Sequence, residues 1–240
     1  LAARRGWPQV GAALRRPGTL PRLTAAALLV GSNWLGFLWA VDQHLVIAGS
    51  LGYFLTPLVN VLLGMLVLKE RLNGKEWLAV GLAVAAVGNE FVALGSLPWV
   101  SLFLGGTFGL YGLVRKQVSV DAITGLWLET LSMLPLVVVY ALWQGSQGHG
   151  VFTGHDGLTD FLLAMSGLMT ALPLMLFAAA TQRLNLATVG MLMYINPTMQ
   201  LVTAVWIFGE DLQPARLVTF GLIWAGLLVY SWSGWQKYRQ

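Results

Sequence analysis

Two prolines have polar residues at the same spacing around them, and this pattern suggests a binding site. They lie in the stretches Tyr53-Phe54-Leu55-Thr56-Pro57-Leu58-Val59-Asn60 and Asn196-Pro197-Thr198-Met199-Gln200. A proline inside a helix removes one backbone hydrogen bond and frees the carbonyl four residues earlier. Residues four apart share a helix face, so the polar residues flanking each proline point the same way. We expect two kinked helices that bind a small molecule through these groups; the alternative is that Asn60 and Gln200 only hold neighbouring helices together.

Glu129 is a carboxylate within an apolar run and is the candidate for proton exchange. Inside a membrane a carboxylate is costly unless it is protonated, paired or hydrated. We therefore expect Glu129 to bind a proton reversibly or to face a cationic substrate. The alternative is a structural acid that is hydrogen-bonded within its own helix bundle or to Arg115 and Lys116. Glu90, near the end of another apolar run, is expected to reach outward to the membrane surface.

Glu70 and Glu210 each follow an apolar run, where a helix is expected to end. A carboxylate at a helix C-terminus opposes the helix dipole, so each residue needs a basic or backbone N–H partner. We assign both residues to loops or gates at the ends of their helices.

Several chemistries are disfavoured by the residue types themselves. With no Cys, the chain has no disulfide, thiolate nucleophile or thiolate metal ligand. His149, His155 and Asp156 match no metal-binding motif, and no His falls in a predicted span, so no metal and no cofactor are expected. An enzyme is therefore not expected, although a membrane-embedded enzyme and a structural membrane subunit are the alternatives to a transporter.

The elements that must position these residues are hydrophobic helices. The chain is 57% hydrophobic and only 10% charged, a composition typical of proteins dissolved in lipid. A membrane span needs about 20 mostly apolar residues, which must be helical because backbone groups cannot go unpaired in lipid. The sequence predicts an all-α, polytopic helix bundle with eight spans: 24–41, 46–68, 77–95, 97–114, 124–143, 159–179, 185–208 and 214–234.

The basic residues predict the orientation of these spans. Of the 14 Lys and Arg residues, all but Arg216 fall in segments on the same side as the N-terminus. Basic residues in short loops concentrate on the cytoplasmic side, so both termini are predicted to be cytoplasmic. The same rule explains the net charge of +4 without a nucleic-acid partner.

A weak internal repeat relates the two halves of the chain. A shift of 140 residues aligns Pro57, Glu70, Leu72, Gly81, Leu82 and Ala85 with Pro197, Glu210, Leu212, Gly221, Leu222 and Ala225. Because the two glutamates fall in loops on opposite sides, the copies cross the membrane in opposite directions, as in alternating-access carriers. We predict a cytoplasmic basic segment over 1–22, three helices of the first repeat over 23–95, five of the second over 96–235 and a cytoplasmic tail over 236–240. The repeat predicts two five-helix halves, of which the first two helices are missing from this sequence.

Longer motifs carry a resemblance to a known family. They are Ser32-Asn33-Trp34, Ser50-Leu51-Gly52-Tyr53-Phe54, Pro57 to Gly64, Glu70-Arg71, Gly95-Ser96-Leu97-Pro98, Tyr111 to Lys116, Thr124-Gly125 with Glu129-Thr130, and Gly209-Glu210. Together they resemble the drug/metabolite transporter superfamily, in its EamA branch, and most closely RarD-type proteins. The resemblance implies two inverted five-helix halves, a multi-pass location in the bacterial inner membrane, and transport of a small metabolite or drug.

The charges in the predicted spans indicate the class of substrate. No Lys or Arg lies at mid-depth, and Arg115 and Lys116 stand at a boundary. An anion buried there without a partner would be costly. Tyr53, Tyr111 and Trp34 offer apolar and cation–π surfaces. A neutral, zwitterionic or cationic substrate, with proton exchange at Glu129, is therefore predicted; a homodimer, the substrate's identity and the direction of transport stay open.

Overall fold

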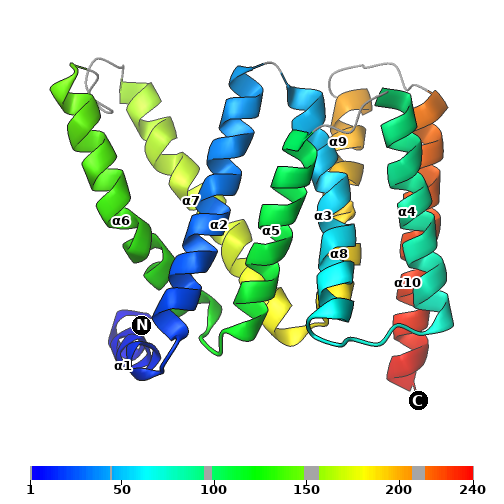
Figure 1. The fold of residues 1–240 in the computed structure, drawn as a ribbon, viewed down its shortest axis with the longest axis horizontal. Coiled ribbons are helices and arrows are strands. Elements are labelled where there is room, and N and C mark those ends of the chain that lie inside the picture. The colour runs from blue at the N-terminus through cyan, green and yellow to red at the C-terminus, as the bar shows by residue number, and fades with distance from the viewer. Residues whose placement is uncertain (1, 44, 95–98, 149–156, 207–213, 240) are drawn as a thin grey trace. The chain divides into compact units, whose positions relative to one another are not determined.

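The chain folds into helices throughout the part that the structure describes. This computed structural model describes residues 2–43, 45–94, 99–148, 157–206 and 214–239, which contain no strand (Figure 1). In chain order the helices are α1 (Ala2–Arg15), α2 (Thr19–Asp42), α3 (Val46–Leu66), α4 (Gly74–Leu94), α5 (Trp99–Gln117), α6 (Ala122–Ser146), α7 (Gly157–Arg183), α8 (Leu186–Met193), α9 (Ile195–Trp206) and α10 (Pro214–Arg239). The predicted all-α class is confirmed.

Five helices have the length and hydropathy needed to cross a bilayer. They are Thr19–Asp42, Gly74–Ala93, Ala122–Ser146, Gly157–Arg183 and Leu217–Gln236, with Gly52–Leu66 as a shorter apolar helix. The chain is therefore a multi-pass membrane protein. Every predicted span contains a helix, but the predicted span 185–208 is divided into α8 and α9. The total of eight spans stays a prediction.

The N-terminal basic segment contains a helix. Residues 2–15 form α1, and α2 already begins at Thr19. Val10 and Ala13, three residues apart on one face of α1, pack against a small cluster that contains Leu23, Val118 and Leu128. This apolar face explains why a basic segment without a long apolar run is helical.

The chain divides into two compact units. Unit 1 comprises Leu1–Leu29 and Val114–Arg183, and unit 2 comprises Val30–Leu113 and Leu184–Gln240. Within unit 1, α6 begins at an Asp121 N-cap, whose carboxylate accepts the N–H of Thr124 at 3.0 Å. Partial burial opposes ionisation of Asp121, but hydrogen bonds from the Thr124 side chain and from backbone N–H groups outweigh it and lower the pKa of the carboxyl.

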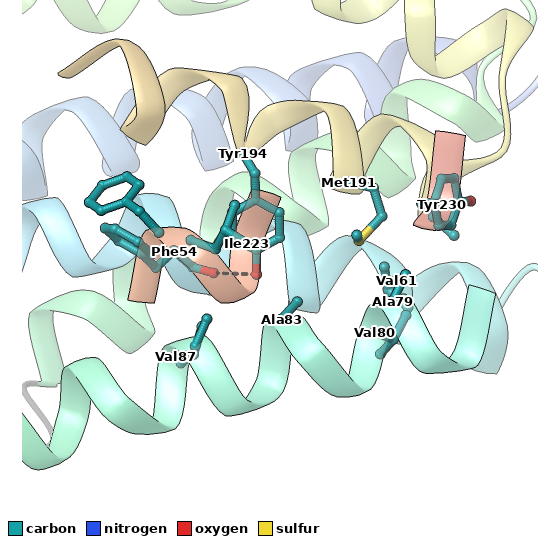
Figure 2. Close-up of a cluster of buried hydrophobic side chains, with 13 residues drawn as sticks. Phe54, Val61, Ala79, Val80, Ala83, Val87, Met191, Tyr194, Ile223 and Tyr230 are labelled. Carbon is teal, nitrogen blue, oxygen red and sulfur yellow. Dashed lines mark hydrogen bonds between the residues drawn. The ribbon is translucent and has the colours of Figure 1, made fainter. Parts of the chain in front are cut away.

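Unit 2 contains the largest core, in which α3 packs on α8 and α4 packs on α10. Figure 2 shows this core, with Phe54, Tyr194, Met191, Ile223 and Tyr230 among its side chains. In Figure 1, α4 and α10 lie side by side along their lengths.

Helices α4 and α10 run in opposite directions. Asn73, just before α4, donates to Ser233 near the end of α10 (2.7 Å). Asn89, near the end of α4, donates to the carbonyl of Ala215 in the first turn of α10 (2.8 Å). These two contacts hold the ends of the antiparallel pair together.

Candidate functional site

The helix that carries Pro197 is interrupted at Tyr194. Helix α8 ends at Met193 and α9 begins at Ile195, so the break lies just before the predicted hinge. Pro197 cannot donate to the Met193 carbonyl, which weakens the turn that contains Tyr194. Pro57, at the matching position of α3, lies inside a helix that continues over Val46–Leu66. The two prolines therefore have different local effects.

Tyr194 joins this break to α3. Its side chain is fully buried, and its hydroxyl donates to the carbonyl oxygen of Phe54 at 3.2 Å (Figure 2). Phe54 directly follows Tyr53, whose carbonyl Pro57 leaves without its usual helical donor. Tyr194 was not among the residues predicted from the sequence, although its place three residues before Pro197 was a usable signal.

Asn60 lies one helical turn from Pro57, where α3 crosses α8. It is fully buried; its Nδ2 donates to the sulfur of Met193 at 3.3 Å, and its Oδ1 has no hydrogen-bond partner. Gly190 makes this crossing close, because a Cβ there would lie 2.7 Å from the Pro57 carbonyl oxygen. An unpaired buried amide oxygen is costly, which makes Asn60 a candidate for binding a donor group.

Thr56 and Tyr53 lie on the same helix as Asn60 but have other contacts. Thr56 is buried and its hydroxyl donates to the Gly52 carbonyl one turn earlier (2.8 Å), so its proton is already used. Tyr53 is half-buried, with its ring edge against Phe37. Of the predicted polar face of α3, Asn60 has the strongest unmet hydrogen-bonding need.

The remaining predicted binding residues have mixed surroundings. Tyr111 is fully buried against Phe108, whereas Trp34 is 43% exposed. Asn196 is exposed on α9, so it does not share the burial of Asn60. The side chain of Gln200 lies outside the described residues. The structure thus brings Asn60 and Tyr194 to the α3–α8 contact, together with the predicted Pro57.

The Glu70 carboxylate accepts hydrogen bonds from two backbone N–H groups, as its position after α3 led us to expect. Its Oε1 accepts the N–H of Leu186 at 2.7 Å, and its Oε2 accepts the N–H of Ala187 at 3.0 Å. These are the first two residues of α8, whose own N-cap residue, Asn185, makes no side-chain capping bond. The prediction of a backbone partner is confirmed for Glu70, and its role as a gate stays a prediction. Glu210 lies outside the described residues.

Glu129 forms an ion pair with Arg115 inside unit 1. Glu129 Oε1 lies 3.2 Å from Arg115 Nη1, and the two side chains are 3% and 0% exposed. Gly125 makes room for the guanidinium, since a Cβ there would lie 2.0 Å from Nη1. The structure therefore provides the pairing that was the alternative for Glu129; proton exchange there stays a prediction. Glu90 does not reach the surface as expected: it is 9% exposed and accepts the Thr219 hydroxyl at 3.0 Å.

A cavity of about 300 Å³ lies within unit 2 among α4, α8 and α10. Its polar lining includes Glu76, Thr188 and Tyr230, and the hydroxyls of Thr188 and Tyr230 are 3.0 Å apart. None of these three residues was predicted as a site residue from the sequence, because they come from three helices far apart in the chain.

The similarity of this chain to known proteins shows its family. No family model matches the chain. An "Uncharacterized transporter" of Vibrio cholerae is 41% identical over 96% of this chain and 76% of its own length. "Protein RarD" of Escherichia coli is 40% identical over 94% of this chain and 76% of its own, and "Uncharacterized transporter YojE" of Bacillus subtilis is 40% identical over 95% and 76%.

The fold also has a counterpart among solved structures. A crystal structure with 17% sequence identity aligns with a TM-score of 0.64 over 93% of this chain and 82% of its own. At that identity the likeness concerns the fold alone, whereas the relatives carry the family. With about three quarters of each relative matched at about 40% identity, this chain belongs to the RarD-like family of membrane transporters.

Proposed function

We propose that this protein is a secondary transporter with two inverted repeats. It carries a small neutral, zwitterionic or cationic metabolite or drug across the bacterial inner membrane by alternating access. Both termini are cytoplasmic, and the repeats are those predicted from the 140-residue shift, over 23–95 and 96–235. In such carriers the binding site lies between the repeats, at interrupted helices near the membrane mid-plane.

Helix starts support the repeat. Helix α3 begins at Val46 and α8 begins at Leu186. These two starts are separated by the same 140 residues that align the two halves of the sequence. The antiparallel packing of α4 on α10 also agrees with copies that cross the membrane in opposite directions.

The single observation that carries the proposal is the Tyr194–Phe54 hydrogen bond. It joins residues 140 positions apart, which are each other's counterparts in the repeat. Counterparts related by a two-fold axis can touch only close to that axis. The contact therefore supports a pseudo-two-fold axis through the α3–α8 crossing, beside Asn60.

The charges of the described residues support the substrate class. Arg115 is buried, but Glu129 neutralises it, so the pair adds no net positive charge for an anion. Binding a proton at Glu129 would release Arg115 from the pair, which gives a route for coupling transport to a pH gradient. Exposed Trp34 and half-buried Tyr53 add aromatic surface for an apolar or cationic substrate.

Transport by the purified protein in sealed vesicles tests this function. A panel of neutral, zwitterionic, cationic and anionic metabolites should show uptake or efflux of one of the first three classes, faster with a pH gradient than without. Empty vesicles are the control. Competition by sugar phosphates alone, or flux that Glu129→Gln leaves equally dependent on pH, would contradict the substrate class and the coupling, respectively.

Asn60→Leu should lower transport at least about tenfold while folded protein in the membrane stays near normal. Leucine branches at Cγ as asparagine does and removes the unpaired oxygen, so its effect on stability should be small. Thr56→Val is the matched control, because the Thr56 hydroxyl is occupied within its own helix; it should change transport less than about threefold. Equal loss of folded protein and transport in Asn60→Leu would instead support a helix-packing role.

A further inference from the structure

We propose that Glu70 is a releasable clasp that closes the end of the transport path predicted to be cytoplasmic. The Glu70 clasp is the pair of hydrogen bonds from Leu186 N–H and Ala187 N–H to the Glu70 carboxylate. It holds the start of α8 to the end of α3 and must open when the carrier opens to the cytoplasm. This inference rests on the proposed function.

The clasp is built from segments far apart in the sequence. Glu70 lies 116 and 117 residues from its two donors, so it does not cap its own helix. A carboxylate at a helix N-terminus gains from both the unpaired N–H groups and the helix dipole. Because α8 has no local side-chain cap at Asn185, its N-terminus depends on Glu70.

The turn after α3 is shaped to deliver this carboxylate. Lys69 has a φ of +56°, a conformation that residues with a side chain rarely adopt. The N–H of Glu70 then donates to the Gly64 carbonyl at 3.0 Å, which folds the turn back onto the last part of α3. Gly64 leaves room for the carboxylate, since a Cβ there would lie 2.6 Å from Glu70 Oε2. The positive φ of Lys69 and the missing side chain of Gly64 thus both serve to place the Glu70 carboxylate.

Among the side-chain hydrogen bonds described between the α3 and α8 segments, the Glu70 clasp involves a charged group. The others are the Tyr194–Phe54 and Asn60–Met193 bonds, which are uncharged and buried further along the helices. Glu70 is half-buried at the end of the pair, so water can replace the two N–H donors when the helices part. Alternating access requires such a contact to open at one end while the crossing near the axis stays closed.

Opening of the clasp would also expose the neighbouring cavity. Thr188 and Met191, in the turns of α8 that follow the clasp, line this cavity, and Met191 is only 1% exposed. A cysteine at Met191 would react with a membrane-impermeant maleimide when α8 moves. Since the chain contains no Cys, such a label reports one site.

The experiment measures maleimide labelling of Met191→Cys in vesicles, with reagent on either side. Glu70→Gln should speed labelling about tenfold or more from the cytoplasmic side, because a neutral amide oxygen replaces a charged acceptor. Gly64→Ala should do the same without changing any charge, because the new methyl group displaces the flexible carboxylate. Arg71→Gln, an exposed neighbouring charge change, is the control and should leave the rate unchanged.

A second comparison separates a clasp from a simple helix cap. Asn185→Asp supplies a carboxylate at the local N-cap of α8 but does not tie α8 to α3. In the Glu70→Gln background it should leave labelling fast; a return to the parent rate would overturn the clasp. Parent rates in both Glu70→Gln and Gly64→Ala would overturn it as well, and Gly64→Ala keeps the test valid if Glu70→Gln does not fold.

Labelling needs no substrate, so the two proposals fail separately. Fast labelling in Glu70→Gln and Gly64→Ala, with no flux of any metabolite by the parent protein, would support the clasp and overturn the proposed function. Normal parent flux with unchanged labelling in both variants would overturn the clasp alone.

Discussion

Arg115→Met should remove most folded protein from the membrane, with a loss of stability of about 3–5 kcal/mol. Arg115 and Glu129 are paired at 3.2 Å with side-chain exposures of 0% and 3%. Replacing only the guanidinium leaves a buried carboxylate without its counter-charge. Such a charge cannot be stabilised by water at this level of burial. Folded protein after mild detergent extraction, and its melting temperature, measure the effect.

The double variant Arg115→Met/Glu129→Leu should recover most of the folded protein. Replacing both members of a buried ion pair by apolar residues is often neutral or stabilising, so the two losses should not add. Lys116→Met is the matched control: Lys116 is half-buried and donates to the Thr181 carbonyl at 3.2 Å, so its loss should be about 1 kcal/mol. A double variant as unstable as Arg115→Met would show that the guanidinium matters for its packing and not for its charge.

The double variant also tests proton coupling. If Glu129 carries the coupled proton, the recovered protein should transport equally fast with and without a pH gradient. Coupling that persists at the parent level would place the exchanged proton on another group.

The sequence predicted the helices better than their contacts. Apolar runs locate a helix because burial in lipid forces every backbone group to pair within its own segment. The same pattern cannot say which way Arg115 points, and a guanidinium two residues from the end of α5 could face either water or protein. Its burial against Glu129 depends on Gly125, whose missing side chain leaves the space.

The internal repeat predicted which residues are counterparts in the two halves, but it did not predict how buried each counterpart is. Asn60 and Gln200 are counterparts, as are Thr56 and Asn196, yet Thr56 is buried and Asn196 exposed. The two helices also differ locally, because a break at Tyr194 separates α8 from α9, whereas α3 continues through Pro57. The Glu70 clasp could not be predicted as a contact either, since its partners are backbone groups more than 100 residues away.

Gly190→Ala should reduce stability by about 1–3 kcal/mol and abolish transport, because it separates α3 from α8 where Gly190 lies against Pro57 and Asn60. The new methyl group would lie 2.7 Å from the Pro57 carbonyl oxygen and 2.9 Å from Asn60 Cβ. Backbone on one side and a Cβ on the other cannot rotate away, so one helix must shift. That shift would also pull Tyr194 from the Phe54 carbonyl and Asn60 from Met193.

Gly221→Ala in α10 is the matched control for this substitution. A Cβ at Gly221 meets nothing within 4 Å, and alanine favours a helix over glycine by up to about 1 kcal/mol. Thermal unfolding in detergent should therefore shift in opposite directions for the two variants, and transport should survive only in Gly221→Ala. Gly190→Ala protein that melts at the parent temperature and still transports would contradict a tight α3–α8 crossing at the centre of the carrier.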